Sequence, residues 1–387
     1  MRSRVLARGR AACACAVLTA AVAGCTSSGS ANSSVTASGN VLRIYVSAAP
    51  TDQPQVAQDV LDAEQLAFNQ STHTVGGFAI RMRTVRGSTI SEQARTVIQD
   101  TSAIAYLGEV VPGSSFASLG ITNALDILQV SPTDTALELT ESTPAVANAP
   151  DGYYESLGTY GRTFARVVPT SGDEAKAQIQ EMQALGVTKL YVSSDGSDYG
   201  RAIANAVTHD VGGGITLASS QAAADGVFYG SASPAVAARF FSSAAGANSS
   251  AKLFGPSALD APGFISALSS SVRNLYISVP GFLKADLNQA GSTFTSQFAA
   301  TYGHAPAPQA IFGYEAMAAV MSVLKEAGAS ANNRSTVVKD FFAIKNRQSV
   351  LGTYSINSNG DTSIAPFVFT RLQDGALVSF KFVSVSG

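Results

Sequence analysis

The residue types that most often carry out covalent chemistry are scarce in this chain of 387 residues. Its three cysteines all lie within the first 25 residues: Cys13, Cys15 and Cys25. The rest of the chain therefore has no disulfide framework, no cysteine zinc site and no catalytic thiol. Its three histidines are far apart in the sequence: His73, His209 and His304. Because a histidine metal centre would have to be assembled from distant segments, we expect no metal site.

Catalytic motifs are also missing. The sequence contains no G-x-S-x-G nucleophile elbow, no P-loop and no dinucleotide-binding fingerprint. We therefore predict that the protein is not an enzyme and takes no cofactor. Its formal net charge of −2 lacks the basic excess that a general nucleic-acid binder needs to displace counterions, so we expect no nucleic-acid partner.

Hydroxyl side chains that follow two apolar runs offer a different chemistry, the binding of a small ligand. Ser114 and Ser115 follow the run 103–110 and precede a helix, so we predict Ser114 as the helix N-cap. The first N–H groups of that helix lack partners, and together with the hydroxyls they could hold a carboxylate. Thr133 and Thr135 follow the next run and could add contacts. The alternative is that all four hydroxyls only cap local structure.

An alternation of short apolar runs and longer helical stretches must position these residues. Strands are predicted at 42–48, 78–85, 103–110, 126–132, 165–169, 189–195, 215–220, 226–230, 252–256 and 274–280. Helices are predicted at 54–70, 91–100, 115–124, 173–185, 199–211, 234–245, 262–270, 291–302, 308–328 and 335–344. Such alternation implies parallel sheets covered by helices, with ligands bound outside the carboxyl ends of the strands. Turn signals at Asn359-Gly360 and Asp374-Gly375 predict antiparallel strands at the end, within 350–356, 366–372 and 377–383.

The N-terminal segment reads as an export signal. Residues 1–10 hold four arginines and no acid, and an apolar run ends at Val22-Ala23-Gly24-Cys25, which resembles a bacterial lipobox. We therefore predict a signal peptide over 1–24, lipidation of Cys25, and a Ser/Gly-rich tether over 25–40. The alternative is an ordinary signal peptide that happens to contain a cysteine. After cleavage the formal charge would fall from −2 to −6, because the four arginines are removed.

Five stretches along the body carry a resemblance to a known family. They are Ala63-Glu64-Gln65 with Asn69; Tyr106-Leu107-Gly108 with Ser114-Ser115; Gln129 through Thr135 with Leu139-Thr140; Phe164 through Pro169 with Asp198-Tyr199-Gly200; and Tyr302-Gly303 with Pro306 and Gly313-Tyr314-Glu315-Ala316. In this order they resemble the type I periplasmic binding proteins, specifically the leucine/isoleucine/valine-binding group of ABC importers. The resemblance covers about Leu42 to Val383.

The resemblance implies an α/β fold with two Rossmann-like lobes, each built on a mostly parallel sheet, joined by a three-segment hinge. Lobe 1 would comprise 41–165 plus 281–350, and lobe 2 would comprise 166–280 plus 351–387. The chain would cross between the lobes near Ala165–Val167, Pro280–Gly281 and Leu351–Gly352. A hinge of this kind lets the lobes close on a ligand.

The resemblance also implies which residues face the ligand. Ser114, Ser115, Thr133 and Thr135 would line one side of the cleft, and Tyr199 would reach across from the other lobe. Tyr229 is a further candidate, although the segment before it is shorter than the family pattern by one helix.

One departure from the family bears on the ligand. Where the amino-acid binders place an acid that neutralises the ligand's ammonium, this chain has Ser257. Asp260 or Asp134 could substitute. Unless one of them does, the chain lacks the partner that an α-amino acid requires, because an unpaired buried ammonium is costly.

The functional expectation is therefore a monomeric, exported lipoprotein, lipid-anchored to the outer face of the cell membrane. It would capture a small polar solute, an amino acid or a related compound, and deliver it to an ABC-transporter permease. The alternative keeps the fold but makes the protein a sensor that presents the bound solute to a membrane receptor. The residues alone do not separate transport from sensing.

Overall fold

The computed structural model describes residues 35–385. The chain divides into two units, Met1–Ser33 and Ser34–Gly387, and every described residue belongs to the second. The predicted signal peptide, Cys25 and most of the predicted tether therefore lie outside the described residues. Within the described part, no helix is both long and apolar enough to cross a membrane.

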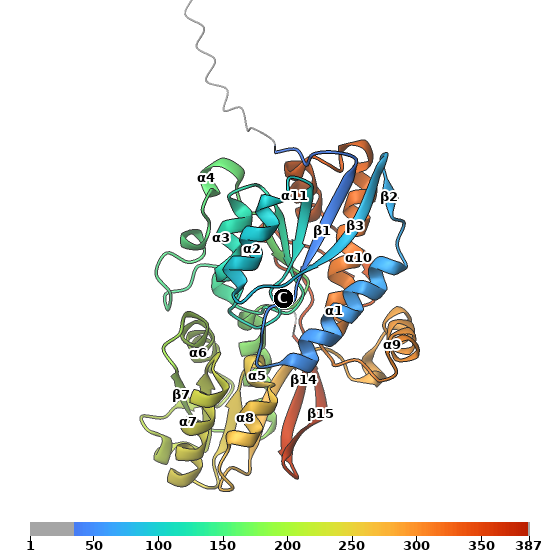
Figure 1. Cartoon of the computed structure of the whole chain (residues 1–387). Helices are drawn as coiled ribbons and strands as arrows, with labels where there is room; N and C mark the ends of the chain where they lie inside the picture. Colours follow the sequence, from blue (N-terminus) through green and yellow to red (C-terminus); the bar gives the residue numbers. More distant parts are fainter. Residues whose placement is uncertain (1–34, 386–387) are drawn as a thin grey trace, which may run out of the picture. The chain divides into compact units, whose positions relative to one another are not determined.

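The first of two large sheets has six strands in the order β2-β3-β1-β4-β5-β6. Figure 1 shows β2, β3 and β1 side by side. Its strands are β1 (Val41–Ser47), β2 (Thr74–Val75), β3 (Phe78–Val85), β4 (Ala103–Leu107), β5 (Leu128–Ser131) and β6 (Phe164–Arg166). All pairs are parallel except β2 with β3. Strand β1 is buried on both faces: Leu42 and Ile44 belong to one hydrophobic cluster, whereas Tyr45 belongs to another. This is why the strand reads as a near-continuous apolar run.

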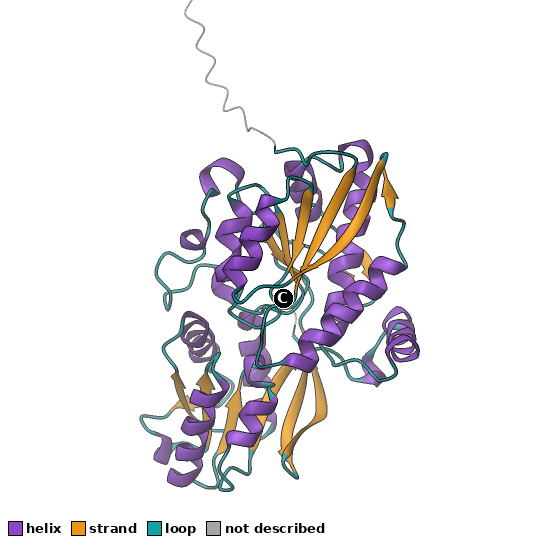
Figure 2. Ribbon diagram, viewed as in Figure 1, coloured by secondary structure: helices purple, strands orange, loops and turns teal. Residues whose placement is uncertain are grey.

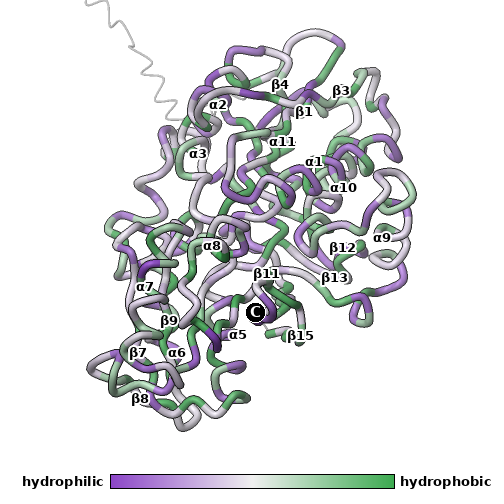
Figure 3. Tube along the Cα trace, turned by 60° about the horizontal axis from the view of Figure 1, so that its bottom comes forward, coloured by the Kyte–Doolittle hydropathy of each residue, from purple (hydrophilic) through white to green (hydrophobic). Residues whose placement is uncertain are grey.

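Helices cover both faces of the first sheet (Figure 2). The larger cluster includes residues of α1 (Pro54–Asn69), α9 (Gln289–Tyr302), α10 (Ala310–Ala327) and α11 (Arg334–Phe342). The other face carries α2 (Ile90–Gln99), with α3 (Phe116–Asn123) packed beside it. Along α1 the trace alternates between hydrophobic and hydrophilic residues (Figure 3), as expected of a helix with one buried face. A short helix, α4 (Leu157–Tyr160), precedes β6. We call this sheet and its helices lobe 1.

The second sheet has seven strands in the order β15-β14-β11-β10-β9-β7-β8. Its strands are β7 (Lys189–Ser194), β8 (Thr216–Leu217), β9 (Gly226–Gly230), β10 (Lys252–Gly255), β11 (Leu275–Pro280), β14 (Pro366–Gln373) and β15 (Ala376–Ser384). One face packs on α5 (Ser171–Ala184) and α6 (Asp198–Asp210), the other on α7 (Pro234–Ala247) and α8 (Pro262–Ala267). We call this sheet and its helices lobe 2.

The predicted antiparallel ending is confirmed for the last two strands, whereas the strand predicted within 350–356 pairs with residues 347–349 in a separate two-stranded sheet. Strand β14 pairs antiparallel with both β11 and β15, and Gln373 pairs with Ala376 across the turn. The two turn residues, Asp374 and Gly375, both have positive φ, at 51° and 78°. Consecutive positive φ values suit the tight hairpin turns that match strand twist, and Asp-Gly is a favoured pair there.

The segment between β8 and β9 holds only a 3₁₀ turn, Gln221–Ala223, as expected for a segment one helix shorter than the family pattern. Other boundaries shift by a few residues. The helix expected to open at Ser91 begins one residue earlier, because Thr89 accepts a hydrogen bond from Glu92 N at 3.2 Å and is the N-cap.

The three segments that connect the lobes lie side by side. Arg166 N donates to Gly360 O at 2.8 Å, and Gly281 N donates to Pro366 O at 3.1 Å. Gly360 leaves no room for a side chain, because a Cβ there would lie 2.4 Å from Phe164 O. The backbone of one crossing is thus in direct contact with the backbone of another.

The third crossing occurs later in the chain than the predicted Leu351–Gly352. Leu351, Tyr354 and Ile356 all belong to the hydrophobic cluster of lobe 1, and β14 does not begin until Pro366. A small hairpin causes the difference: β12 (Arg347–Ser349) pairs with β13 (Gly352–Tyr354) on the lobe 1 side. We therefore propose that lobe 1 extends to about Ile356.

Candidate ligand-binding site

A cavity of about 390 Å³ lies between loops of the two lobes. Lobe 1 supplies Ser47–Gln53 after β1 and Glu109–Val111 after β4, and lobe 2 supplies Ala232 after β9 and Ala258 after β10. All four loops follow the carboxyl ends of parallel strands, where open α/β sheets bind ligands. The volume falls within the range of small-molecule sites, about 300–1,000 Å³.

A larger hollow of about 720 Å³ lies entirely within lobe 2, between α8 and the β14–β15 hairpin. It is an open groove at the side of the sheet, and Asp260 is the one predicted site residue that lines it. Because it lies away from the strand ends that face the other lobe, we take the smaller cavity as the candidate site.

The loop that leads into α3, whose helix end was predicted to hold a ligand carboxylate, is already occupied by the side chain of Asp134. Asp134 Oδ1 accepts hydrogen bonds from Gly113 N at 2.6 Å and Ala136 N at 3.1 Å. Asp134 Oδ2 accepts one from Ser115 N at 2.7 Å. A carboxylate of the protein itself therefore takes the N–H groups of Gly113 and of the N-cap residue Ser115, at the helix end where the dipole favours negative charge.

The two serines of this loop take roles different from those predicted. Ser115, not Ser114, is the N-cap residue of α3, and its hydroxyl makes no capping bond because it accepts from Glu109 N at 3.1 Å. Ser114 donates its hydroxyl to Val111 O and lines the cavity. The prediction of Ser114 as the N-cap is therefore wrong, since Asp134 reaches the helix end from the neighbouring loop.

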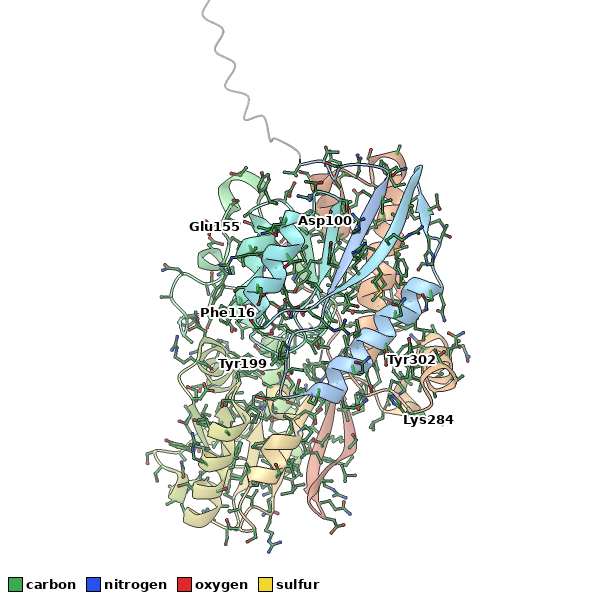
Figure 4. All side chains as sticks on the ribbon, viewed as in Figure 1. Asp100, Phe116, Glu155, Tyr199, Lys284 and Tyr302 are labelled. Carbon is green, nitrogen blue, oxygen red and sulfur yellow. The ribbon has the colours of Figure 1, made fainter. Side chains whose placement is uncertain are left out.

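Tyr199 lies at the junction of the two lobes (Figure 4). It is the second residue of α6, whose N-cap Ser197 accepts from Gly200 N at 3.0 Å. Its side chain is only 2% exposed and packs against Gly113 of lobe 1, where an added Cβ would lie 2.8 Å from the Tyr199 Cβ. Tyr199 thus fills the space between the lobes in this arrangement.

The Tyr199 hydroxyl lies beside the hydroxyls of Thr135 and Ser257. The hydroxyl oxygens of Tyr199 and Thr135 are buried, and neither makes a hydrogen bond within the described residues. Thr133 is satisfied instead by Val110, whose carbonyl accepts its hydroxyl at 2.5 Å. Three predicted site residues, one from lobe 1 and two from lobe 2, thus meet in one buried polar cluster.

An acid does lie beside Ser257, although it does not line the cavity: Glu174 of α5. Glu174 accepts hydrogen bonds from Ser257 N at 2.6 Å, Ser257 Oγ at 3.1 Å and Ser278 Oγ at 2.6 Å. Burial raises the pKa of Glu174 to about 7. The sequence held a signal for it, because Glu174, Gln178 and Glu181 recur at helical spacing on the buried face of α5.

Two further buried acids were missed by the sequence analysis. Glu109 lines the cavity, is 1% exposed, and accepts hydrogen bonds from Ser47 Oγ at 2.5 Å and Tyr106 Oη at 2.6 Å. Burial raises its pKa above the usual range. Glu138 lies near Tyr199, and burial raises the pKa of Glu138 to about 8. Neither stands at a position for which a local motif predicts binding.

Of the nine predicted ligand-binding residues, only Ser114 lines the cavity, and Asp260 and Tyr229 lie outside its wall like the others. Asp260 accepts a hydrogen bond from Gln309 Nε2 at 2.9 Å, and its carbonyl accepts from Gln53 Nε2 at 2.9 Å. Tyr229 stacks on Phe240 with ring centroids 3.8 Å apart and belongs to the hydrophobic cluster beneath α7. In the described part of the chain, no group of three or more His, Cys, Asp or Glu side chains is arranged to hold a metal.

Two parallel-dominated sheets, joined by three adjacent crossings and enclosing a cavity at their facing strand ends, define the type I periplasmic-binding-protein fold. The predicted fold class is thus confirmed. No protein-family model matches the sequence, and no curated protein matches it.

Solved structures show the same fold. A leucine-binding protein from Thermotoga maritima has a TM-score of 0.70 at 18% identity, covering 88% of this chain and 98% of that one. A branched-chain amino acid transporter substrate-binding protein from Streptococcus pneumoniae, in complex with isoleucine, has a TM-score of 0.69 at 15% identity, covering 90% of this chain and 100% of that one. A solute-binding protein of an ABC transporter from R. palustris, in complex with benzoate, has a TM-score of 0.65 at 17% identity, covering 90% of this chain and 98% of that one. At these identities the likeness establishes the fold, and the ligands are those of the other proteins.

Proposed function

We propose that the chain is a solute-binding protein that captures a small polar solute between its two lobes for an ABC importer. The observation that carries the proposal is the cavity at the facing strand ends, with Tyr199 of lobe 2 packed on Gly113 of lobe 1. Three adjacent backbone crossings suit a hinge that opens and closes such a cavity. The solved structures with this fold include transporter substrate-binding proteins with bound amino acids or benzoate, which supports the proposal.

The proposal is tested by a thermal-shift screen of residues 35–387 against amino acids, amides, amines, short carboxylates and aromatic acids. A solute at about 100 times its dissociation constant stabilises the folded state by about 2.7 kcal/mol. We expect one chemical class to raise the Tm. A flat response to every class would contradict solute binding. Loss of uptake of the identified solute on gene deletion would separate transport from sensing.

Replacing Gly113 with alanine is expected to weaken ligand binding at least tenfold. The new Cβ would meet the Tyr199 Cβ at 2.8 Å, so the lobes could not reach the closed arrangement. Gly113 also has a φ of +79°, so alanine adds backbone strain of about 1 kcal/mol. The matched control is Gly77→Ala, because Gly77 has a φ of +91° and nothing within 4 Å of an added Cβ. Titration calorimetry with the solute found in the screen should show lost affinity for Gly113→Ala alone; equal affinity for both variants would refute closure across this contact.

We propose that the protein is exported and lipid-anchored through Cys25 at the outer face of the cell membrane. The support is the sequence of residues 1–25, which lie outside the described residues. Two acyl chains on one cysteine give stable membrane attachment. We expect Cys25→Ala to move the protein from the membrane fraction to the soluble fraction, whereas Cys15→Ala leaves it in the membrane. Mass spectrometry of membrane-bound protein with an unmodified Cys25 would contradict the anchor.

A further inference from the structure

We propose that the cavity takes a small organic cation that carries no carboxylate. The inference rests on the proposed solute-binding function and narrows its ligand class. It follows from the charge and the hydrogen-bonding groups around the cavity, considered one wall at a time.

A carboxylate ligand would need the backbone N–H groups at the start of α3. The backbone N–H groups just before α3 point toward Asp134, which accepts from Gly113 N at 2.6 Å and from the N of the N-cap residue Ser115 at 2.7 Å. Asp134 is fully buried, so solvent does not screen its charge. A ligand carboxylate beside it would find these donors taken and would face a like charge at short range.

The lobe 1 wall of the cavity carries acidic side chains. Its acidic side chains are Glu109, which is buried, and Asp52, which is exposed at the edge of the cavity. The cavity lining, all of it within the described residues, contains no lysine, arginine or histidine. The Glu109 carboxylate accepts hydrogen bonds from the hydroxyls of Ser47 and Tyr106, and Glu64 is a second buried acid close to it.

Neither Glu109 nor Glu64 forms an ion pair within residues 35–385. A buried acid without a cation is costly in its ionised form. An ammonium group in the cavity would supply the cation that the protein omits, because Glu109 lines the cavity and keeps acceptor capacity beyond its two hydroxyl partners.

The lobe 2 wall of the cavity consists of Ala232, Pro234 and Ala258. These side chains offer apolar contact and no charge. Behind this wall, Asp195 Oδ2 accepts from Ala232 N at 3.2 Å and Glu174 accepts from Ser257 N at 2.6 Å, so two acids lie on that side. Together with Ile90 and Val110 of lobe 1, the wall suits a short aliphatic group attached to the cationic head.

The proposal is tested with four compounds that share one branched aliphatic group and differ in charge. They are L-leucinamide (a cation), L-leucine (a zwitterion), 4-methylpentanamide (neutral) and 4-methylpentanoate (an anion). Titration calorimetry at pH 6.5 should show leucinamide binding at least tenfold more tightly than each of the other three. Tighter binding of leucine or 4-methylpentanoate would overturn the proposal while leaving solute binding intact. Equal or tighter binding of 4-methylpentanamide would overturn the requirement for a cation.

Variants of the two acids make the test specific. Glu109→Gln should reduce leucinamide affinity at least tenfold, while Glu155→Gln, at an exposed glutamate that does not line the cavity (labelled in Figure 4), should leave it unchanged. Asp134→Asn should raise the affinity for 4-methylpentanoate relative to leucinamide, because it removes the competing charge at the α3 N-terminus. This ratio remains informative even if Glu109→Gln fails to fold. If no compound here and none in the wider screen binds, the solute-binding function fails and the inference fails with it.

Discussion

Replacing Arg166 with methionine is expected to lower the free energy of unfolding by about 3–5 kcal/mol, the usual loss when one partner of a buried ion pair is removed. The Arg166 side chain is completely buried, and its Nε donates to Asp361 Oδ1 at 2.8 Å. Methionine fills much of the same volume but leaves Asp361, itself 2% exposed, as an unpaired buried charge. The effect should therefore come from the charge more than from packing.

The other hydrogen bonds of Arg166 explain why the loss should be at the upper end of this range. Its guanidinium also donates to Asp134 O at 2.9 Å, Ala136 O at 2.8 Å and Thr140 Oγ1 at 2.7 Å. One side chain thus joins the first crossing, the third crossing and the loop that carries Asp134. A hydrogen bond to a charged group contributes about 1.5–3 kcal/mol to stability, so the loss of these three bonds adds to the loss of the ion pair.

Urea unfolding of the soluble body measures this change, with Arg81→Met as the control. Arg81 is an exposed arginine of β3 that makes no ion pair in the described part of the chain, so its loss should stay within about 0.5 kcal/mol. Adding Asp361→Asn to Arg166→Met should recover part of the stability, because the unpaired charge disappears. A loss below about 1 kcal/mol for Arg166→Met would show that the ion pair does not hold the crossings together.

The parts of the fold that local patterns control were predictable from the sequence. Apolar runs and helical spacing gave the strands and helices to within a few residues, because each element depends on its own periodicity. The Asp374-Gly375 turn is a similar case, since two positive φ values in a row favour those residue types. The third crossing was misplaced because the β12–β13 hairpin has weak strand signals and is fixed by packing against lobe 1.

The chemistry of the site depends on contacts between distant segments, which local patterns do not report. Asp134 was predicted as a possible substitute for the acid missing at position 257, yet its carboxylate accepts hydrogen bonds from backbone N–H groups in the loop after the neighbouring strand. Glu174 lies 83 positions before Ser257 in the sequence, and only the fold brings them together. The predicted loops face one another across the cavity, but the identity of each contact required the structure.

The stability of the protein is expected to fall as the pH rises from about 4.5 to about 8, through the buried acids Glu138 and Glu174. Burial raises the pKa of Glu138 to about 8 and that of Glu174 to about 7, against an ordinary value of 4.5 in the unfolded chain. Below pH 4.5 both groups are protonated in both states, and their contribution to stability is fully present. Above it the unfolded chain releases these protons first, so the folded state is progressively disfavoured until the folded pKa is passed.

The variants Glu138→Gln and Glu174→Gln isolate this effect from the other titrating groups. Each pKa unit corresponds to about 1.4 kcal/mol. Between pH 4.5 and pH 8, ionisation of each wild-type glutamate should therefore lower the free energy of unfolding by several kcal/mol, whereas the uncharged glutamine causes no such loss. The difference in unfolding free energy between each variant and the wild type should therefore shift in the variant's favour across that range. Glu155→Gln, at an exposed site, should follow the wild-type profile.

Urea unfolding at intervals of half a pH unit would resolve the two groups, since the Glu174 difference should level off about one unit below that of Glu138. These acids lie on opposite lobes and both face Tyr199, so their ionisation also opposes the closed arrangement. Parallel pH profiles for wild type and both variants would mean that neither acid is held protonated in the folded protein.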